Sequence, residues 1–199
     1  MLHTRPILFV LALALCLMRP APAAADAITF DDLAAPSAGW GDVPTDYAGM
    51  QWHGFETVTN DYFRDSYRNT YDFPSNEMAA YNGDGALEVS FSRAEAFDLT
   101  GAAFGGWTAY DSKPWYSAKT LTLRGFLSGE QVAETSIALS FGAFEEFALN
   151  CEGVDEVRFT SDGEEHYWLM DDVHIEEASG GGAVAPTPIP ATIWLMGAG

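Results

Sequence analysis

Basic residues are scarce in this chain. Of its 199 residues, 9 are Lys or Arg and 29 are Asp or Glu, which gives a formal net charge of −20 at pH 7. Nucleic acids and anionic lipid headgroups bind proteins through clusters of positive charge. The composition therefore argues against a nucleic-acid partner and against an anionic membrane surface. It suits solubility, or the binding of divalent cations.

Cysteine is almost absent. The two cysteines are Cys16, in an N-terminal apolar run, and Cys151. If that run is removed on export, Cys151 alone remains, and one cysteine cannot form an intramolecular disulfide even in an oxidising compartment. Two interpretations of Cys151 stay open, a nucleophile and a small buried residue at a strand end, and the second is the commoner case.

Motifs of common catalytic sites are lacking as well. The sequence contains no His-Glu-x-x-His, no Gly-x-Ser-x-Gly and no phosphate-binding loop. Acidic pairs at 145–146, 164–165 and 176–177 resemble the carboxylates of a glycosidase. Such pairs arise by chance in so acidic a chain. The sequence therefore predicts that the protein is not an enzyme.

No hydrophobic run is long enough to cross a membrane. The longest, residues 7–18, has twelve residues, whereas a spanning helix needs about 20. Arg5 precedes this run and small residues follow it at 23–27, so residues 1–25 are predicted to be a signal peptide. Cleavage before Asp26 removes Arg5 and Arg19, and the net charge then changes from −20 to −22.

Apolar and polar residues alternate in several short segments. The alternation is typical of half-buried strands and occurs at 28–30, 87–92, 120–127, 132–139, 157–159 and 169–175. No segment has the pattern of a three-turn helix. Residues 26–178 are therefore predicted to form an all-β domain, an antiparallel β-sandwich that is jelly-roll-like and similar to galactose-binding and carbohydrate-binding modules.

The connections between these segments carry their own predictions. Gly129 can adopt a positive φ, so the segments on either side of it are expected to form a hairpin. Residues 92–97 are expected to form a single helical turn. Residues 60–85 contain six Tyr or Phe side chains among polar ones and are interpreted as a long ordered loop. Its aromatic side chains serve either to bind a ligand or to anchor the loop on the core.

The composition changes after residue 178. Residues 179–190 are rich in Gly and Pro and are predicted to be a linker with a proline motif. Residues 191–199 are apolar and are interpreted as the start of a sorting or anchor segment.

This tail resembles the PEP-CTERM family of bacterial sorting signals, in which a proline motif precedes an apolar helix and a basic cluster. The matching residues are Val184-Ala185-Pro186-Thr187-Pro188-Ile189-Pro190, followed by nine apolar or small residues without an arginine cluster. The body is similar to exported members of the family at Thr29-Phe30-Asp31-Asp32-Leu33, at 43–52 and at Trp168-Leu169-Met170-Asp171-Asp172.

The resemblance implies a location and a partner. It implies export to the cell surface or the extracellular space of a Gram-negative bacterium, with a role linked to exopolysaccharide. It implies an exosortase-type sorting enzyme as partner if the tail is complete in the native gene, and contact with the membrane only through the C-terminal tail. It implies no established activity.

Four carboxylates near the two ends of the domain form a candidate metal site. Alternation places Asp171 on the apolar face of the last strand, and Asp32 on the same face as Ile28 and Phe30. First and last strands are commonly neighbours in jelly rolls. Carboxylate oxygens suit Ca²⁺, which carbohydrate-binding jelly rolls often hold in a similar place. The alternative is that the carboxylates accept backbone N–H bonds. The candidate calcium ligands are Asp31, Asp32, Asp171 and Asp172.

Aromatic side chains are the better candidates for ligand binding, because their flat faces stack on sugar rings. The alternative is packing in the core or within loops. The candidates are Trp107, Tyr110, Trp115 and Tyr116, together with Tyr67 and Tyr71 of the predicted loop.

Three functions follow from these features. The first is an exported, non-catalytic surface or matrix protein whose jelly-roll module binds polysaccharide. The second is an extracellular glycan hydrolase. The third is a purely structural surface component.

Overall fold

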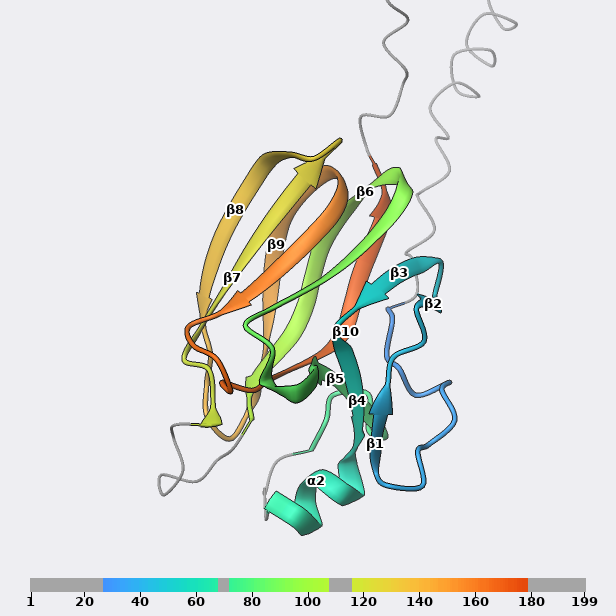
Figure 1. The fold of residues 1–199 in the computed structure, drawn as a ribbon, viewed down its shortest axis with the longest axis vertical. Helices are drawn as coiled ribbons and strands as arrows, with labels where there is room; N and C mark the ends of the chain where they lie inside the picture. Colours follow the sequence, from blue (N-terminus) through green and yellow to red (C-terminus); the bar gives the residue numbers. More distant parts are fainter. Residues whose placement is uncertain (1–26, 68–71, 108–115, 179–199) are drawn as a thin grey trace, which may run out of the picture.

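The computed structural model describes residues 27–67, 72–107 and 116–178 (Figure 1). This part of the chain contains ten β-strands and one α-helix, and it has no helix long and apolar enough to cross a membrane. The predicted signal peptide and the segments 179–190 and 191–199 lie outside the described residues. The elements are β1 (Trp40–Asp42), β2 (Asp46–Tyr47), β3 (Met50–His53), β4 (Phe55–Thr59), α2 (Asn60–Tyr67), β5 (Met78–Asn82), the 3₁₀ turn η1 (Gly83–Gly85), β6 (Glu88–Gly106), β7 (Thr120–Leu127), β8 (Glu130–Ala138), β9 (Phe144–Ser161) and β10 (Trp168–Glu177).

The strands form two layers that share β6 and β9. Hydrogen bonding follows the order β1-β4-β5-β10-β6-β9-β7-β8, and β3 joins β6. The first half of β6 pairs with β3 and with the second half of β9, which also pairs with β7. We call these strands, with β8, the first layer. The second half of β6 pairs with β10 and with the first half of β9. These strands, with β1, β4 and β5, are the second layer. The predicted antiparallel sandwich is confirmed.

A bend carries β6 and β9 from one layer to the other. The register of the two strands shifts between Ser92 and Phe97 and again before Leu99. On the β9 side, Gly153 has a φ of 63°, and its N–H donates a 2.6 Å hydrogen bond to Asp98 Oδ1. Bulges bend strands and increase their twist, which allows a strand to change sheets. The helical turn predicted at 92–97 is therefore wrong, because these residues continue β6 through its irregular part.

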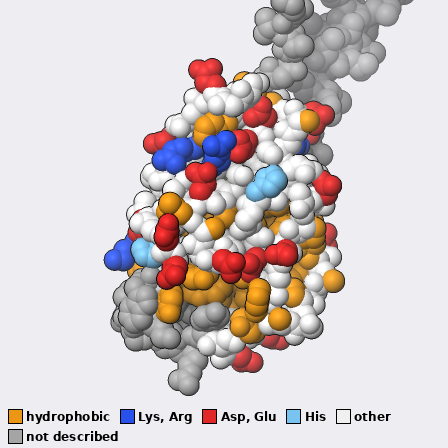
Figure 2. Space-filling view, viewed as in Figure 1, with side chains coloured by type: hydrophobic (Ala, Val, Ile, Leu, Met, Phe, Trp, Pro, Cys, Tyr) orange, Lys and Arg blue, Asp and Glu red, His pale blue; other side chains and the backbone are white. Residues whose placement is uncertain are grey.

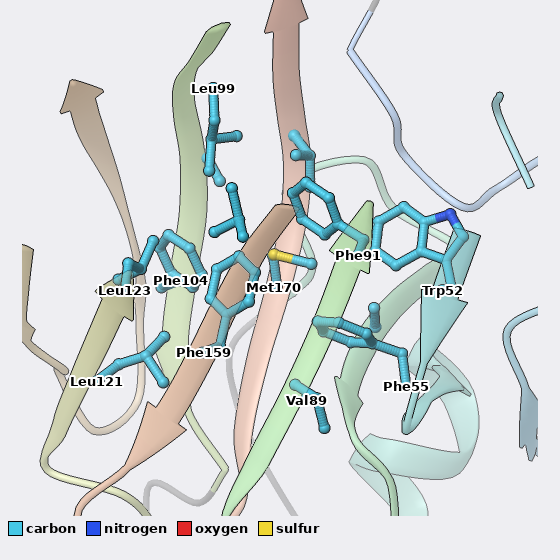
Figure 3. Packing of buried hydrophobic residues seen from close by; sticks show 14 of the residues in the cluster. Trp52, Phe55, Val89, Phe91, Leu99, Phe104, Leu121, Leu123, Phe159 and Met170 are labelled. Atoms are coloured by element: carbon cyan, nitrogen blue, oxygen red, sulfur yellow. The ribbon is translucent and has the colours of Figure 1, made fainter. Parts of the chain in front are cut away.

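Aromatic side chains from both layers fill the space between them (Figure 3). Phe159 of the first layer stacks on Trp168 of the second, with ring centroids 5.6 Å apart. The ring centroids of Phe91 in β6 and Trp52 in β3 are 4.9 Å apart. Such pairs stabilise a core beyond the area they bury, by about 0.5–1.5 kcal/mol each. Among the described residues, nine aromatic side chains are buried in this core.

The β7–β8 turn and the pairing of the two ends of the domain agree with the predictions made from the sequence. β7 and β8 pair across a two-residue turn in which Ser128 and Gly129 both have positive φ, 53° and 81°. These angles belong to the type I′ turn that joins tight hairpins. Ile28 forms an isolated antiparallel bridge with Val173, so the first and last segments of the domain are neighbours as expected.

The segment 60–85 is not a long loop, contrary to the prediction. It contains α2, whose first turn follows Thr59, and β5, which pairs with both β4 and β10. Phe63 of α2 is buried against Trp107 and Phe73 on the outer face of the second layer. The helix has only eight residues, too few for its periodicity to be recognised. We call this second set of apolar residues the outer cluster: Val58, Phe63, Phe73, Ala79, Tyr81, Trp107 and Leu169.

Candidate functional site

A pocket of about 340 Å³ opens on the outer face of the second layer, beside the outer cluster. Its walls come from β1, β4, α2, β5 and η1, from the residues next to the end of β6 and the start of β10, and from Tyr116, which precedes β7. Among the described residues, nine side chains line the pocket, of which six are aromatic and two are acidic. The lining residues are Trp40, Glu56, Val58, Tyr62, Tyr81, Asp84, Trp107, Tyr116 and Tyr167.

Three aromatic rings form a continuous group in the pocket. The ring of Trp107 lies 4.9 Å from Tyr81 and 5.1 Å from Tyr167, measured between centroids. Tyr81 and Trp107 are buried, together with Val58. Packing on the outer cluster fixes these side chains before any ligand arrives, so little conformational entropy remains to be lost on binding.

The rim of the pocket is exposed. The side chain of Trp40 is 45% exposed and that of Tyr116 is 39% exposed. Figure 2 shows hydrophobic side chains gathered over the lower half of one face, with acidic side chains among them. A flat aromatic side chain that stays accessible beside a preformed pocket is typical of a sugar-stacking platform.

Two carboxylates line the pocket. The Tyr81 hydroxyl donates a hydrogen bond to the Glu56 carboxylate, and this bond orients the Glu56 side chain. Asp84 lies in η1 with a φ of 52° and is exposed. The pKa of Tyr167 is raised, first by burial and then by the negative charges of Asp84, Glu165 and Glu56. The carboxylates therefore act on the same end of the pocket, where they can accept hydrogen bonds or bind a cation.

The structure brings together two of the aromatic residues predicted from the sequence, Trp107 and Tyr116, in this pocket. Tyr110, Trp115 and Tyr71 lie outside the described residues, and Tyr67 is the last residue of α2.

Most of the other pocket residues were not candidates from the sequence. Asp84 lies in the turn-forming run Asn82-Gly83-Asp84-Gly85, which was a usable signal for an ordered turn that presents a carboxylate. The remaining positions have no shared sequence pattern, because tertiary folding alone brings them together. Tyr62 and Tyr81 belong to the segment whose aromatic side chains were expected either to bind a ligand or to anchor a loop. The residues not considered for binding are Trp40, Glu56, Val58, Asp84 and Tyr167.

A separate group of carboxylates connects the two ends of the domain. Asp171 is fully buried, and its Oδ2 accepts hydrogen bonds from the Ser75 N–H at 3.0 Å and the Ser75 hydroxyl at 2.9 Å. Asp31 Oδ1 lies 3.1 Å from the same hydroxyl and accepts the Met78 N–H at 2.8 Å. Burial raises the pKa of Asp171 to about 7, although the bonds from Ser75 and Asp172 oppose that rise.

The face predicted for Asp32 is wrong, whereas Asp171 is buried as predicted but does not share a face with Val173. Phe30 has a φ of 65°, which ends the alternation, and Asp32 is exposed and accepts a 2.5 Å hydrogen bond from the Tyr47 hydroxyl. Asp172 has a φ of 47° and interrupts the alternation of β10. Val173 therefore packs in the main core, as Met170 does, whereas Asp171 contacts Ser75.

Both carboxylate oxygens of Asp171 already have hydrogen-bond donors. Asp171 Oδ1 accepts the Asp172 N–H at 2.8 Å, and its Oδ2 accepts two bonds from Ser75. A calcium site needs six to eight oxygens with lone pairs directed at the ion. Within the three described stretches, no group of three or more His, Cys, Asp or Glu side chains has the arrangement of a metal site. The contacts match the alternative of hydrogen-bond acceptors, and calcium stays a prediction.

Comparison with known proteins gives no family. No family model matches the chain, and no curated protein matches it. One similar solved structure is an adhesin domain of Lys-gingipain, with 11% identity and a TM-score of 0.47 over 75% of this chain and 97% of that one. Another is a fucose-binding module of Streptococcus pneumoniae, with 11% identity and a TM-score of 0.38 over 59% of this chain and 82% of that one. A third is an exo-beta-agarase, with 8% identity and a TM-score of 0.44 over 77% of this chain and 25% of that one. The chain spans about a quarter of the agarase. Similarities this distant assign no function to the chain.

Proposed function

We propose that this protein is an exported, non-catalytic module that binds polysaccharide through the aromatic pocket of the second layer. One observation carries the proposal: buried aromatic rings, exposed aromatic rings and two carboxylates line a single pocket of about 340 Å³. Aromatic faces provide apolar contact for a sugar ring, and carboxylates accept hydrogen bonds from its hydroxyl groups.

The proposed location is the cell surface or extracellular matrix of a Gram-negative bacterium. The signal-peptide pattern of residues 1–25 and the PEP-CTERM-like tail support it. An exosortase-type enzyme is the proposed processing partner if the native tail continues into a complete signal. A carbohydrate-binding module at this location would hold matrix polysaccharide close to the cell.

Affinity electrophoresis tests the proposal. Native gels containing xylan, hydroxyethyl cellulose, glycol chitosan or alginate are expected to retard the protein in at least one case. Trp40→Ala should weaken that retardation about fivefold, because a stacked aromatic ring contributes on the order of 1 kcal/mol. Phe141→Ala is the matched control, since Phe141 is 44% exposed but does not line the pocket.

The outcomes separate the three functions. Equal retardation of the Trp40→Ala variant and the wild type would mean that the pocket is not the binding site. Failure of every polysaccharide to retard the protein would favour the structural role. Release of reducing sugar from any of these polymers, lost in Glu56→Gln, would instead show a hydrolase with Glu56 in its active site.

A further inference from the structure

The charged side chains around the pocket are acidic. Of the nine described residues that line it, two are acidic, and none is Lys, Arg or His. Glu165 adds a third negative charge close enough to affect Tyr167. The whole protein also has a net charge of −20. A polymer of uronic acids or sulfated sugars would bring more negative charge into this field, which disfavours its binding.

The arrangement of Glu56 supports a role in binding. Its carboxylate accepts a hydrogen bond from the buried residue Tyr81, which holds it at the pocket wall. Gly83 leaves the space that Glu56 occupies, since a Cβ at position 83 would lie 2.9 Å from Glu56 Cγ. Glu56 is thus fixed beside aromatic rings, where a ligand cation finds both a carboxylate and ring faces.

We infer that the pocket selects a protonated amino sugar, as found in a de-N-acetylated hexosamine polymer. This inference rests on the proposed function and adds the chemical class of the ligand. An ammonium group pairs with Glu56 and Asp84 and lies against Trp or Tyr faces, which attract cations. The carbon face of the sugar ring stacks on the remaining aromatic side chains. An N-acetyl group has no charge and loses the first of these interactions.

Isothermal titration with short oligosaccharides tests the inference. The probes are the tetramer of glucosamine, the tetramer of N-acetylglucosamine and a tetramer of mannuronate, each at pH 6 and at two salt concentrations. The glucosamine tetramer should bind at least about tenfold more tightly than the N-acetylated tetramer, given the strength of a cation–π contact combined with an ion pair. The mannuronate tetramer should show no binding.

Two double variants separate the pocket from the general charge of the protein. Glu56→Gln/Asp84→Asn should remove the preference for glucosamine, measured as the ratio of the two tetramer affinities, because both tetramers also lose carboxylate acceptors for their hydroxyl groups in this variant. Glu146→Gln/Glu152→Gln removes the same charge from exposed positions of β9 and should keep the preference. Tetralysine is the control for nonspecific attraction, and the two double variants should weaken its binding to a similar, small extent.

The results distinguish this inference from the proposed function. Equal or tighter binding of the N-acetylated tetramer, at the pocket, would overturn the amino-sugar inference and keep the binding function. A preference lost equally in both double variants would show attraction by net charge alone and would also overturn it. If neither these tetramers nor the polysaccharides in the gels bind, the proposed function itself fails.

Discussion

The stability of the wild-type protein relative to the Asp171→Asn variant should fall as the pH rises from about 4 to about 7. Burial raises the pKa of Asp171 in the folded protein to about 7, against an ordinary value of 3.8. The folded state therefore binds the proton more tightly than the unfolded state in this range. The favourable contribution is complete below about pH 4 and is lost as the pH passes through about 7. The expected change is on the order of 2–4 kcal/mol.

Urea unfolding at pH 4, 5, 6, 7 and 8 measures this effect. The informative quantity is how the difference in unfolding free energy between wild type and Asp171→Asn depends on pH, because the amide also changes the hydrogen bonds to Ser75 at every pH. Asp42→Asn, at an exposed position, is the control for the general loss of one negative charge. A difference that stays constant from pH 4 to pH 8 would show that Asp171 titrates alike in both states.

The second large effect is expected at Asn82, a fully buried residue at the end of β5. Its amide group donates hydrogen bonds to the Ala86 carbonyl at 2.8 Å and the His166 carbonyl at 3.1 Å. Its Oδ1 accepts the Trp168 N–H at 3.0 Å. Asn82→Ala leaves all three backbone groups without this partner, so we expect a loss of about 3 kcal/mol.

Thermal unfolding followed by circular dichroism should show this loss as a Tm lower by about 10 °C. Asn150→Ala, at an exposed position of β9, should leave the Tm within about 2 °C of wild type. Asn82 also precedes Asp84 and holds the segment that carries Tyr167, so the variant should bind polysaccharide less well even below its Tm. A Tm equal to that of wild type would mean that water or a local shift replaces the three bonds.

The sequence was sufficient to predict an antiparallel sheet, but not the positions at which its strands become irregular. Alternation identified β7 and β8, where buried Leu121 and Leu123 lie on one face, and Gly129 identified their turn. Alternation failed after Phe30, where the chain turns, and at Asp172, where the register of β10 with β6 shifts and the following side chains change faces. Nothing in the local sequence at either position requires a positive φ, which tertiary packing imposes.

The candidate site was predictable only in part, for a related reason. Trp107 and Tyr116 were recognised as ligand-binding candidates because aromatic residues cluster around them in the sequence. Trp40, Glu56 and Tyr167 come from distant parts of the chain and meet only when β1, β4 and β10 are assembled. The composition of the chain suggested a binding surface with aromatic side chains. The position of the pocket depends on long-range strand pairing and could not be predicted.

The sharing of β6 and β9 between the layers has a consequence for how the domain opens. In a sandwich whose layers are connected only by loops, one sheet can separate from the other while keeping its own hydrogen bonds. Here, two continuous strands belong to both sheets, and Asp98 and Gly153 hold the bend between their halves. Peeling one layer away would break the pairing of β6 with β9 along its length. The layers therefore form one cooperative unit, and the slowest-exchanging amides of both should report the same global unfolding event.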